Sequence, residues 1–122
     1  MTIQRLDHVQ LAMPPGREAD AIAFYAGVLG LPHVPKPAVL AVRGGCWFES
    51  TTVKIHLGVE ADFRPAQKAH PALVVDDLPA LVAHLRDHQV SVRDGDAIDG
   101  VARVYVDDPF GNRIELLEPG DR

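Results

Sequence analysis

The two halves of the chain can be superposed on each other, and this internal duplication constrains the fold more than any single segment does. Residues 8–13 match residues 70–75 at an offset of 62, and each segment leads into a predicted helix. Residues 54–57 match residues 113–116 at an offset of 59, and each of these segments closes its half. The 122 residues therefore predict a single domain, 1–122. It consists of module 1 (5–59) and module 2 (69–118), joined by a connector (60–68).

The first module is expected to contain one strand, one helix and three further strands. Residues 9–13 alternate like a half-buried strand, which Pro14 and Pro15 end. The next apolar residues recur at the spacing of one helix face, namely Ile22, Tyr25, Ala26 and Leu29. Three short strands are then predicted, at residues 39–42, 46–49 and 53–57.

The second module repeats this order. Residues 72–75 are a predicted strand, and Asp76 and Asp77 followed by Pro79 are typical of a helix start. One face of this helix carries Leu78, Leu81, Val82 and Leu85. Three more strands are predicted at residues 90–92, 101–106 and 113–117. The predicted fold class is therefore α+β, with two tandem βαβββ modules.

Charge and composition exclude several classes of partner. Twelve Lys and Arg against 17 Asp and Glu give a net charge of −5, which repels nucleic acid and anionic lipid. No apolar run approaches the ~20 residues of a membrane span, so we expect a soluble, cytoplasmic protein. Cys46 is the only cysteine, which excludes an intrachain disulfide and favours a buried thiol in a reducing compartment. The 47% of hydrophobic residues can supply a core without a structural metal, so any metal is expected to be functional.

Four residues that are common metal ligands stand at corresponding places of the duplication: His8, His56, His70 and Glu115. Because side chains alternate along a strand, His56 points away from its apolar neighbours, and so does Glu115. The same alternation applies to the two remaining histidines. The sequence therefore predicts that all four side chains meet on one solvated, concave surface.

Three imidazoles and one carboxylate suit a divalent transition metal, which can be Zn, Ni, Fe, Mn or Co. The ligand set alone does not choose among these metals. Three protein ligands already suffice for a metal site, so a role in metal binding is less strongly indicated for His56 than for the other three residues.

Further residues are candidates for contact with a substrate. Arg103 and Tyr105 share a strand face, where a guanidinium can hold a carboxylate or phosphate and a phenol can donate to an oxyanion. A solvated edge strand is the alternative interpretation of this pair. Trp47 and Phe48 face opposite sides of their strand, so at most one lines a pocket, and Trp47 is the candidate. The remaining histidines are assigned no role: His84 and His88 on the exposed helix face, and His33 in a loop.

From residue 6 to residue 118 the chain resembles the vicinal oxygen chelate superfamily. The resemblance is carried by residues 6–9 (Leu-Asp-His-Val), by residues 24–31 at the end of the first helix, and by residues 105–116. The superfamily contains glyoxalase I, type I extradiol dioxygenases, fosfomycin resistance enzymes and bleomycin resistance proteins. The resemblance implies that the two modules form a cupped, mostly antiparallel sheet, the glyoxalase/bleomycin resistance/dioxygenase fold.

The resemblance also implies roles for individual residues. His8, His70 and Glu115 match a triad of two histidines and one carboxylate, and Glu115 is the implied catalytic base. His56 matches a fourth ligand that is usually glutamate in glyoxalase I. This departure leaves Glu115 as the only obvious base among the ligands, which weakens an assignment as glyoxalase I itself.

The function implied by the resemblance is a metal-dependent enzyme. A divalent cation would polarise neighbouring oxygens of a small substrate, as in glyoxalase-like lyase or isomerase reactions. An extradiol-type dioxygenase is one alternative, and a metal-free protein that binds or sequesters an antibiotic is another. The resemblance further implies a homodimer, and nothing in the sequence identifies the substrate.

Overall fold

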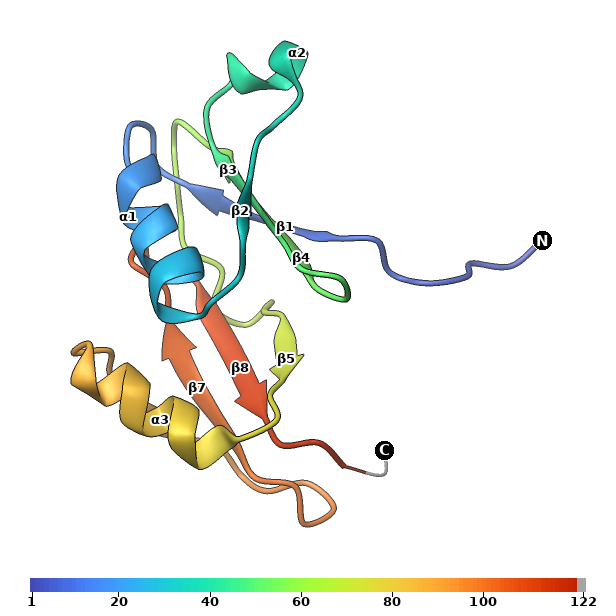
Figure 1. The fold of residues 1–122 in the computed structure, drawn as a ribbon, viewed down its shortest axis with the longest axis vertical. Helices are drawn as coiled ribbons and strands as arrows, with labels where there is room; N and C mark the ends of the chain where they lie inside the picture. Colours follow the sequence, from blue (N-terminus) through green and yellow to red (C-terminus); the bar gives the residue numbers. More distant parts are fainter. Residues whose placement is uncertain (121–122) are drawn as a thin grey trace. The chain divides into compact units, whose positions relative to one another are not determined.

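The computed structural model describes residues 1–120, which fall into two units, Met1–Arg64 and a second that begins at Pro65. The first unit contains β1 (Val9–Met13), α1 (Glu18–Ile22), the π-helical segment η1 (Ala23–Val28), β2 (His33–Val34), α2 (Ala38–Ala41), β3 (Cys46–Glu49) and β4 (Lys54–Val59). The second contains β5 (Ala72–Val74), α3 (Leu78–Asp87), β6 (Arg93–Asp94), β7 (Arg103–Asp107) and β8 (Arg113–Leu117). Figure 1 shows both units coloured along the sequence. The α+β class is confirmed.

Each unit forms its own four-stranded sheet, ordered β1-β4-β3-β2 in the first and β5-β8-β7-β6 in the second. The first and last strands of a unit run parallel, whereas the other neighbours are antiparallel. Gln10 lies opposite His56, and Ala72 lies opposite Glu115. These two register pairs are related by the offsets of 62 and 59 found in the sequence, so the duplication is confirmed at the level of single residues.

The core of the first unit contains fewer of the predicted helix residues than expected. Tyr25 and Phe48 are fully buried, and their rings stack with centroids 5.2 Å apart. Of the predicted apolar face only Tyr25 is buried, while its neighbours Ala21 and Phe24 take the other buried positions. The physical reason is η1, because a π-helical turn is wider than an α-helical turn and changes which side chains share a face.

Two predicted strands are wrong in position. Residues 39–42 lie in and just after the short helix α2, and the strand beside β3 is instead β2. Pro37 precedes α2 with φ −53°, and none of the helix residues is buried, so no core contact requires an extended chain there. In the second unit the strand predicted at 90–92 is displaced to β6, where Arg93 lies opposite Tyr105.

The turn between β7 and β8 is held by a buried carboxylate. Asp108 accepts hydrogen bonds from the backbone N–H groups of Phe110 and Asn112 at 2.9 Å, and from the Asn112 amide at 2.9 Å. The side-chain oxygen Oδ1 of Asn112 accepts a hydrogen bond from the backbone N–H of Ala66 at 2.9 Å. Gly111 has φ +92°, a backbone conformation that residues with a side chain rarely adopt. This turn fixes the register that places Tyr105 opposite Glu115.

Cys46 is buried, as the sequence predicts, with 2% of its surface exposed. Burial raises the pKa of its thiol, and the nearby Glu18 carboxylate raises it further. The helices that the structure describes, all within residues 1–120, are too short or too polar to span a membrane.

Replacement of Asp108 by alanine is expected to destabilise the protein by about 3 kcal/mol, because it leaves buried N–H groups without an acceptor. The matched control is Asp107→Ala, which removes only a half-exposed ion pair with Arg93 and should cost less than about 1 kcal/mol. Urea denaturation followed by circular dichroism measures both. Equal stability of the two variants would contradict the role given to Asp108.

Candidate functional site

The four predicted metal ligands form two pairs, one in each unit. In the first unit the rings of His8 and His56 lie with centroids 4.3 Å apart. In the second unit His70 Nε2 lies 3.1 Å from Glu115 Oε1. Within residues 1–120 no cluster of three or more His, Cys, Asp or Glu side chains is arranged to hold a metal ion.

His70 is oriented by the backbone. Its Nδ1 lies 2.9 Å from the carbonyl oxygen of Lys68, which can only accept, so Nδ1 carries the proton. The other ring nitrogen, Nε2, then faces the carboxylate of Glu115. Two facing lone pairs repel each other, so this contact needs a proton on Nε2 or a cation between the two atoms. A backbone carbonyl that fixes the opposite nitrogen is the usual arrangement around a metal-binding histidine.

Glu115 is held by its second oxygen. Arg103 Nη1 lies 3.2 Å from Glu115 Oε2, and Arg103 Nε donates to the carbonyl oxygen of Asp96 at 2.6 Å. The backbone N–H of Glu115 donates to Pro71 at 3.0 Å, which fixes the start of β5 beside it. Because Arg103 binds Oε2, the carboxylate presents Oε1 to His70.

The ring of Tyr105 lies at the centre of this group. The His70 ring meets it edge-on, with centroids 5.5 Å apart. The Arg103 guanidinium carbon lies 5.3 Å from the ring centroid, and that of Arg113 lies 5.5 Å from it. The predicted pair Arg103 and Tyr105 thus lies close to Glu115 and His70: Arg103 contacts Glu115, and the Tyr105 ring contacts the His70 ring.

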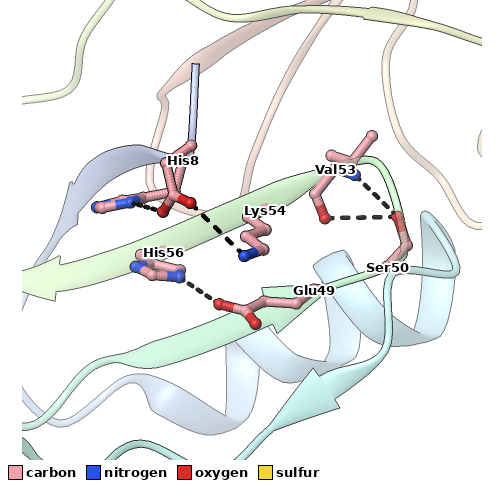
Figure 2. Close-up of polar contacts among 7 residues, drawn as sticks. His8, Glu49, Ser50, Val53, Lys54 and His56 are labelled. Carbon is pink, nitrogen blue, oxygen red and sulfur yellow. Dashed lines mark hydrogen bonds and ion pairs between the residues drawn. The ribbon is translucent and has the colours of Figure 1, made fainter. Parts of the chain in front are cut away.

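His8 stands just before β1 and is exposed. Its Nδ1 lies 2.9 Å from Asp7 Oδ2, and Asp7 Oδ1 lies 3.7 Å from Lys54 Nζ (Figure 2). The hydrogen bond from His8, and then the charge of Lys54, lower the pKa of the Asp7 carboxyl group. With Nδ1 donating to Asp7, His8 keeps Nε2 as a lone-pair donor for a proton or a metal.

His56 lies in an aromatic stack with only 4% of its surface exposed. The Trp47 ring is almost parallel to it, at 6° and 4.1 Å, and the His8 ring lies 4.3 Å away. Its Nε2 lies 2.7 Å from Glu49 Oε2, an interaction that Figure 2 shows between β4 and β3. Since a carboxylate accepts, Nε2 of His56 is the protonated nitrogen.

The chemistry of the donor atoms separates His56 from the other three ligands. Two donors that bind one transition metal at about 2.0–2.2 Å lie about 3 Å apart, which agrees with the 3.1 Å between His70 and Glu115. The rings of His8 and His56 are inclined by only 23°. A metal bound by both rings must lie in the plane of each, but planes so nearly parallel intersect farther away than the length of a metal–nitrogen bond. His56 therefore does not fit as a co-ligand of His8.

The expectation of a solvated surface is wrong for His56 and Glu115. They are 4% and 7% exposed. The rings of Trp47 and His8 stack on His56, and Arg103 and His70 contact Glu115. The partner that the sequence analysis missed is Glu49, although its position two residues after Trp47 places it on the same strand face. His84 on α3 and His88, the residue that caps its C-terminus, are exposed as predicted. The loop predicted for His33 is wrong, because His33 lies on β2 with its ring 5.5 Å from that of Phe48.

Comparisons with known proteins agree on one family. The sequence model of the glyoxalase/bleomycin resistance protein/dioxygenase superfamily matches residues 5–116. Among solved structures, a glyoxalase family protein from Bacillus anthracis is 46% identical, with a TM-score of 0.93 and 98% of each chain covered. No functionally curated protein matches the sequence.

More distant structures share the fold. The genomically encoded fosfomycin resistance protein FosX from Listeria monocytogenes is 13% identical, with a TM-score of 0.77, and the match covers 98% of this chain and 97% of that one. TnmS3, an antibiotic binding protein from Streptomyces sp. CB03234, is 22% identical with a TM-score of 0.69. That match covers 97% of this chain and all of TnmS3.

Replacement of Glu49 by alanine is expected to destabilise the protein by about 1–3 kcal/mol, because the buried Nε2–H of His56 loses its acceptor. The matched control is Glu60→Ala, an exposed position just after β4, which should change stability by less than about 0.5 kcal/mol. Thermal and urea unfolding measure the difference. If Glu49→Ala is as stable as Glu60→Ala, the Glu49–His56 contact contributes nothing to the fold.

Proposed function

The chain belongs to the glyoxalase/bleomycin resistance protein/dioxygenase superfamily, and from this premise we propose that it is a metal-dependent enzyme acting on a small oxygenated substrate. His70 and Glu115 would hold a divalent transition metal, for which His8 also offers a donor atom of the correct type. When bound, the metal supplies Lewis-acid polarisation of two neighbouring substrate oxygens. Both the lyase or isomerase chemistry and the extradiol-type oxygenation expected from the sequence use this polarisation.

The observation that carries the proposal is the contact between His70 and Glu115. The 3.1 Å between Nε2 and Oε1 suits two ligands of one metal, and the Lys68 carbonyl selects the tautomer that leaves Nε2 able to bind. His8 is oriented in the same way, because its Nδ1 is hydrogen-bonded to Asp7 and its Nε2 remains available to bind a metal. Three side chains thus offer a donor atom of the correct type.

Each of the remaining residues has a proposed task. Glu115 is the proposed general base when its Oε1 is not bound to the metal, and Arg103 holds its other oxygen, Oε2. The Tyr105 hydroxyl is a donor for negative charge that develops on a substrate oxygen. Trp47 offers an aromatic face, although in this structure that face stacks on His56.

A second candidate is a metal-free protein that binds a small molecule. One observation favours it: Nε2 of His56 already binds the Glu49 carboxylate, and Oε2 of Glu115 already binds Arg103. TnmS3, which is described as an antibiotic binding protein, shares the fold. This candidate requires that the protein bind its ligand equally well with and without metal.

The homodimer implied by the family resemblance forms part of the same proposal. Light scattering coupled to size-exclusion chromatography should give twice the chain mass of 13.2 kDa. A mass of 13.2 kDa at micromolar concentration would contradict it.

The proposed function is tested by metal binding to tag-free protein. Cobalt(II) or zinc titration by calorimetry should show one tight site, and His70→Ala or Glu115→Ala should weaken it by at least about tenfold. His56→Ala should weaken it less, since the His56 ring is not placed to share an ion with His8. All titrations use a background with His84→Ala and His88→Ala, which removes the exposed histidine pair of α3.

The control variant is His33→Ala, an exposed histidine outside the site, which should bind metal like the parent protein. Equal affinity of the parent, His70→Ala and Glu115→Ala proteins would refute the assignment. Absence of any stoichiometric metal would favour the binding protein over the enzyme.

A further inference from the structure

Arg113, at the start of β8, is a cation that forms no ion pair with a carboxylate among residues 1–120. The residue is half-buried, and its Nε is fully buried with no hydrogen-bond acceptor among the residues that the structure describes. The side-chain contact of its guanidinium is with the face of Tyr105, 5.5 Å from the ring centroid. A buried donor without an acceptor is rare and costs about 1–3 kcal/mol unless a ligand or water satisfies it.

The other two arginines of this sheet are fully engaged. Arg93 makes two hydrogen bonds to the Asp107 carboxylate, at 3.2 and 2.9 Å. Arg103 holds Glu115 and the Asp96 carbonyl. Asp107 is the residue that lies opposite Arg113 across the β7–β8 ladder, but its two oxygens are already bound by Arg93. In the part of the chain that the structure describes, Arg113 is therefore unpaired, although it lies opposite a carboxylate that binds Arg93.

The position of Arg113 relates it directly to the candidate base. It precedes Glu115 by two residues on β8, so the two side chains share a face and their Cα atoms lie about 6.6 Å apart. The Tyr105 ring contacts both Arg113 and His70. A molecule that reaches from Glu115 to Arg113 would thus pass over Tyr105 and need only be a few atoms long.

We propose that Arg113 is a substrate-binding residue that receives an anionic group, a carboxylate or a phosphate, of the small molecule acted on beside His70 and Glu115. This inference rests on the proposed function for the location of the reaction, and it adds the charge class of the substrate. The planar guanidinium offers parallel N–H donors that match both anions. The anion would accept hydrogen bonds from the guanidinium of this half-buried residue and supply the negative charge that Arg113 lacks among the described residues.

The net charge of the chain makes this site unusual. At −5 the protein as a whole repels anions, whereas this sheet carries Arg93, Arg103 and Arg113 near one another. Of these, Arg113 alone has no carboxylate partner among the described residues. Anion binding is therefore expected at one defined place and not over the whole surface.

The test is a titration of metal-free protein with inorganic phosphate and, separately, with succinate, in buffer treated with a chelating resin. The readout is the NMR signal of the Arg113 Nε–H group, assigned by its loss in Arg113→Gln. We expect saturable shifts of this signal with millimolar affinity for at least one anion. Binding measured by calorimetry should be weakened by about tenfold or more in Arg113→Gln.

The matched control is Arg93→Gln, which removes an equal charge from the same sheet and should change anion affinity by less than about twofold. Binding that is unchanged in Arg113→Gln, or no saturable binding of either anion, would overturn the inference. Metal titration of Arg113→Gln keeps the two proposals apart. If the parent protein binds metal but neither anion, this inference alone is overturned. If His70→Ala loses metal binding while the parent protein binds an anion at Arg113, both proposals are supported.

Discussion

Parallel pairing between the first and last strands of each unit is the constraint on which the rest of the structure depends. In the second unit β5 pairs with β8 and Ala72 lies opposite Glu115, so the segment that leads into β5 lies close to the centre of β8. This pairing brings His70 to within 3.1 Å of Glu115, which is 45 residues later in the chain. The same pairing in the first unit brings His8 onto the ring of His56. Backbone hydrogen bonds thus bring together side chains that are far apart in the sequence.

The two copies of the duplicated module carry different types of side chain at equivalent positions. The first unit stacks Trp47 on His56, where the second places Tyr105 opposite Glu115. Gly45 lies two residues before Trp47. A Cβ atom added to Gly45 would lie 2.1 Å from the Leu57 carbonyl oxygen, so this position of the first unit has no room for a side chain. The second unit has Arg103 two residues before Tyr105, and this side chain holds Glu115. One sheet is therefore an aromatic and histidine cluster, and the other is a network of charges.

Sequence periodicity predicted the fold well where side-chain alternation was decisive. It placed Ile55 and Leu57 in the core and His56 on the other face, and it found the register offsets of the duplication. It failed at residues 39–42, because a short apolar run does not distinguish a strand from one helical turn. It could not reveal the Lys68 carbonyl or the Glu49 carboxylate as histidine partners, since these contacts depend on backbone position and rotamers.

We propose that His70 binds a cation through Nε2 while its Nδ1 stays hydrogen-bonded to the Lys68 carbonyl oxygen. NMR of the His70 ring nitrogens during addition of zinc to metal-free protein tests this arrangement. We expect that Nδ1 keeps its proton throughout and that the Nε2 signal moves to the range of a zinc-bound nitrogen at one equivalent. An Nε2 signal that does not respond to saturating zinc, or an Nδ1 that loses its proton, would contradict it.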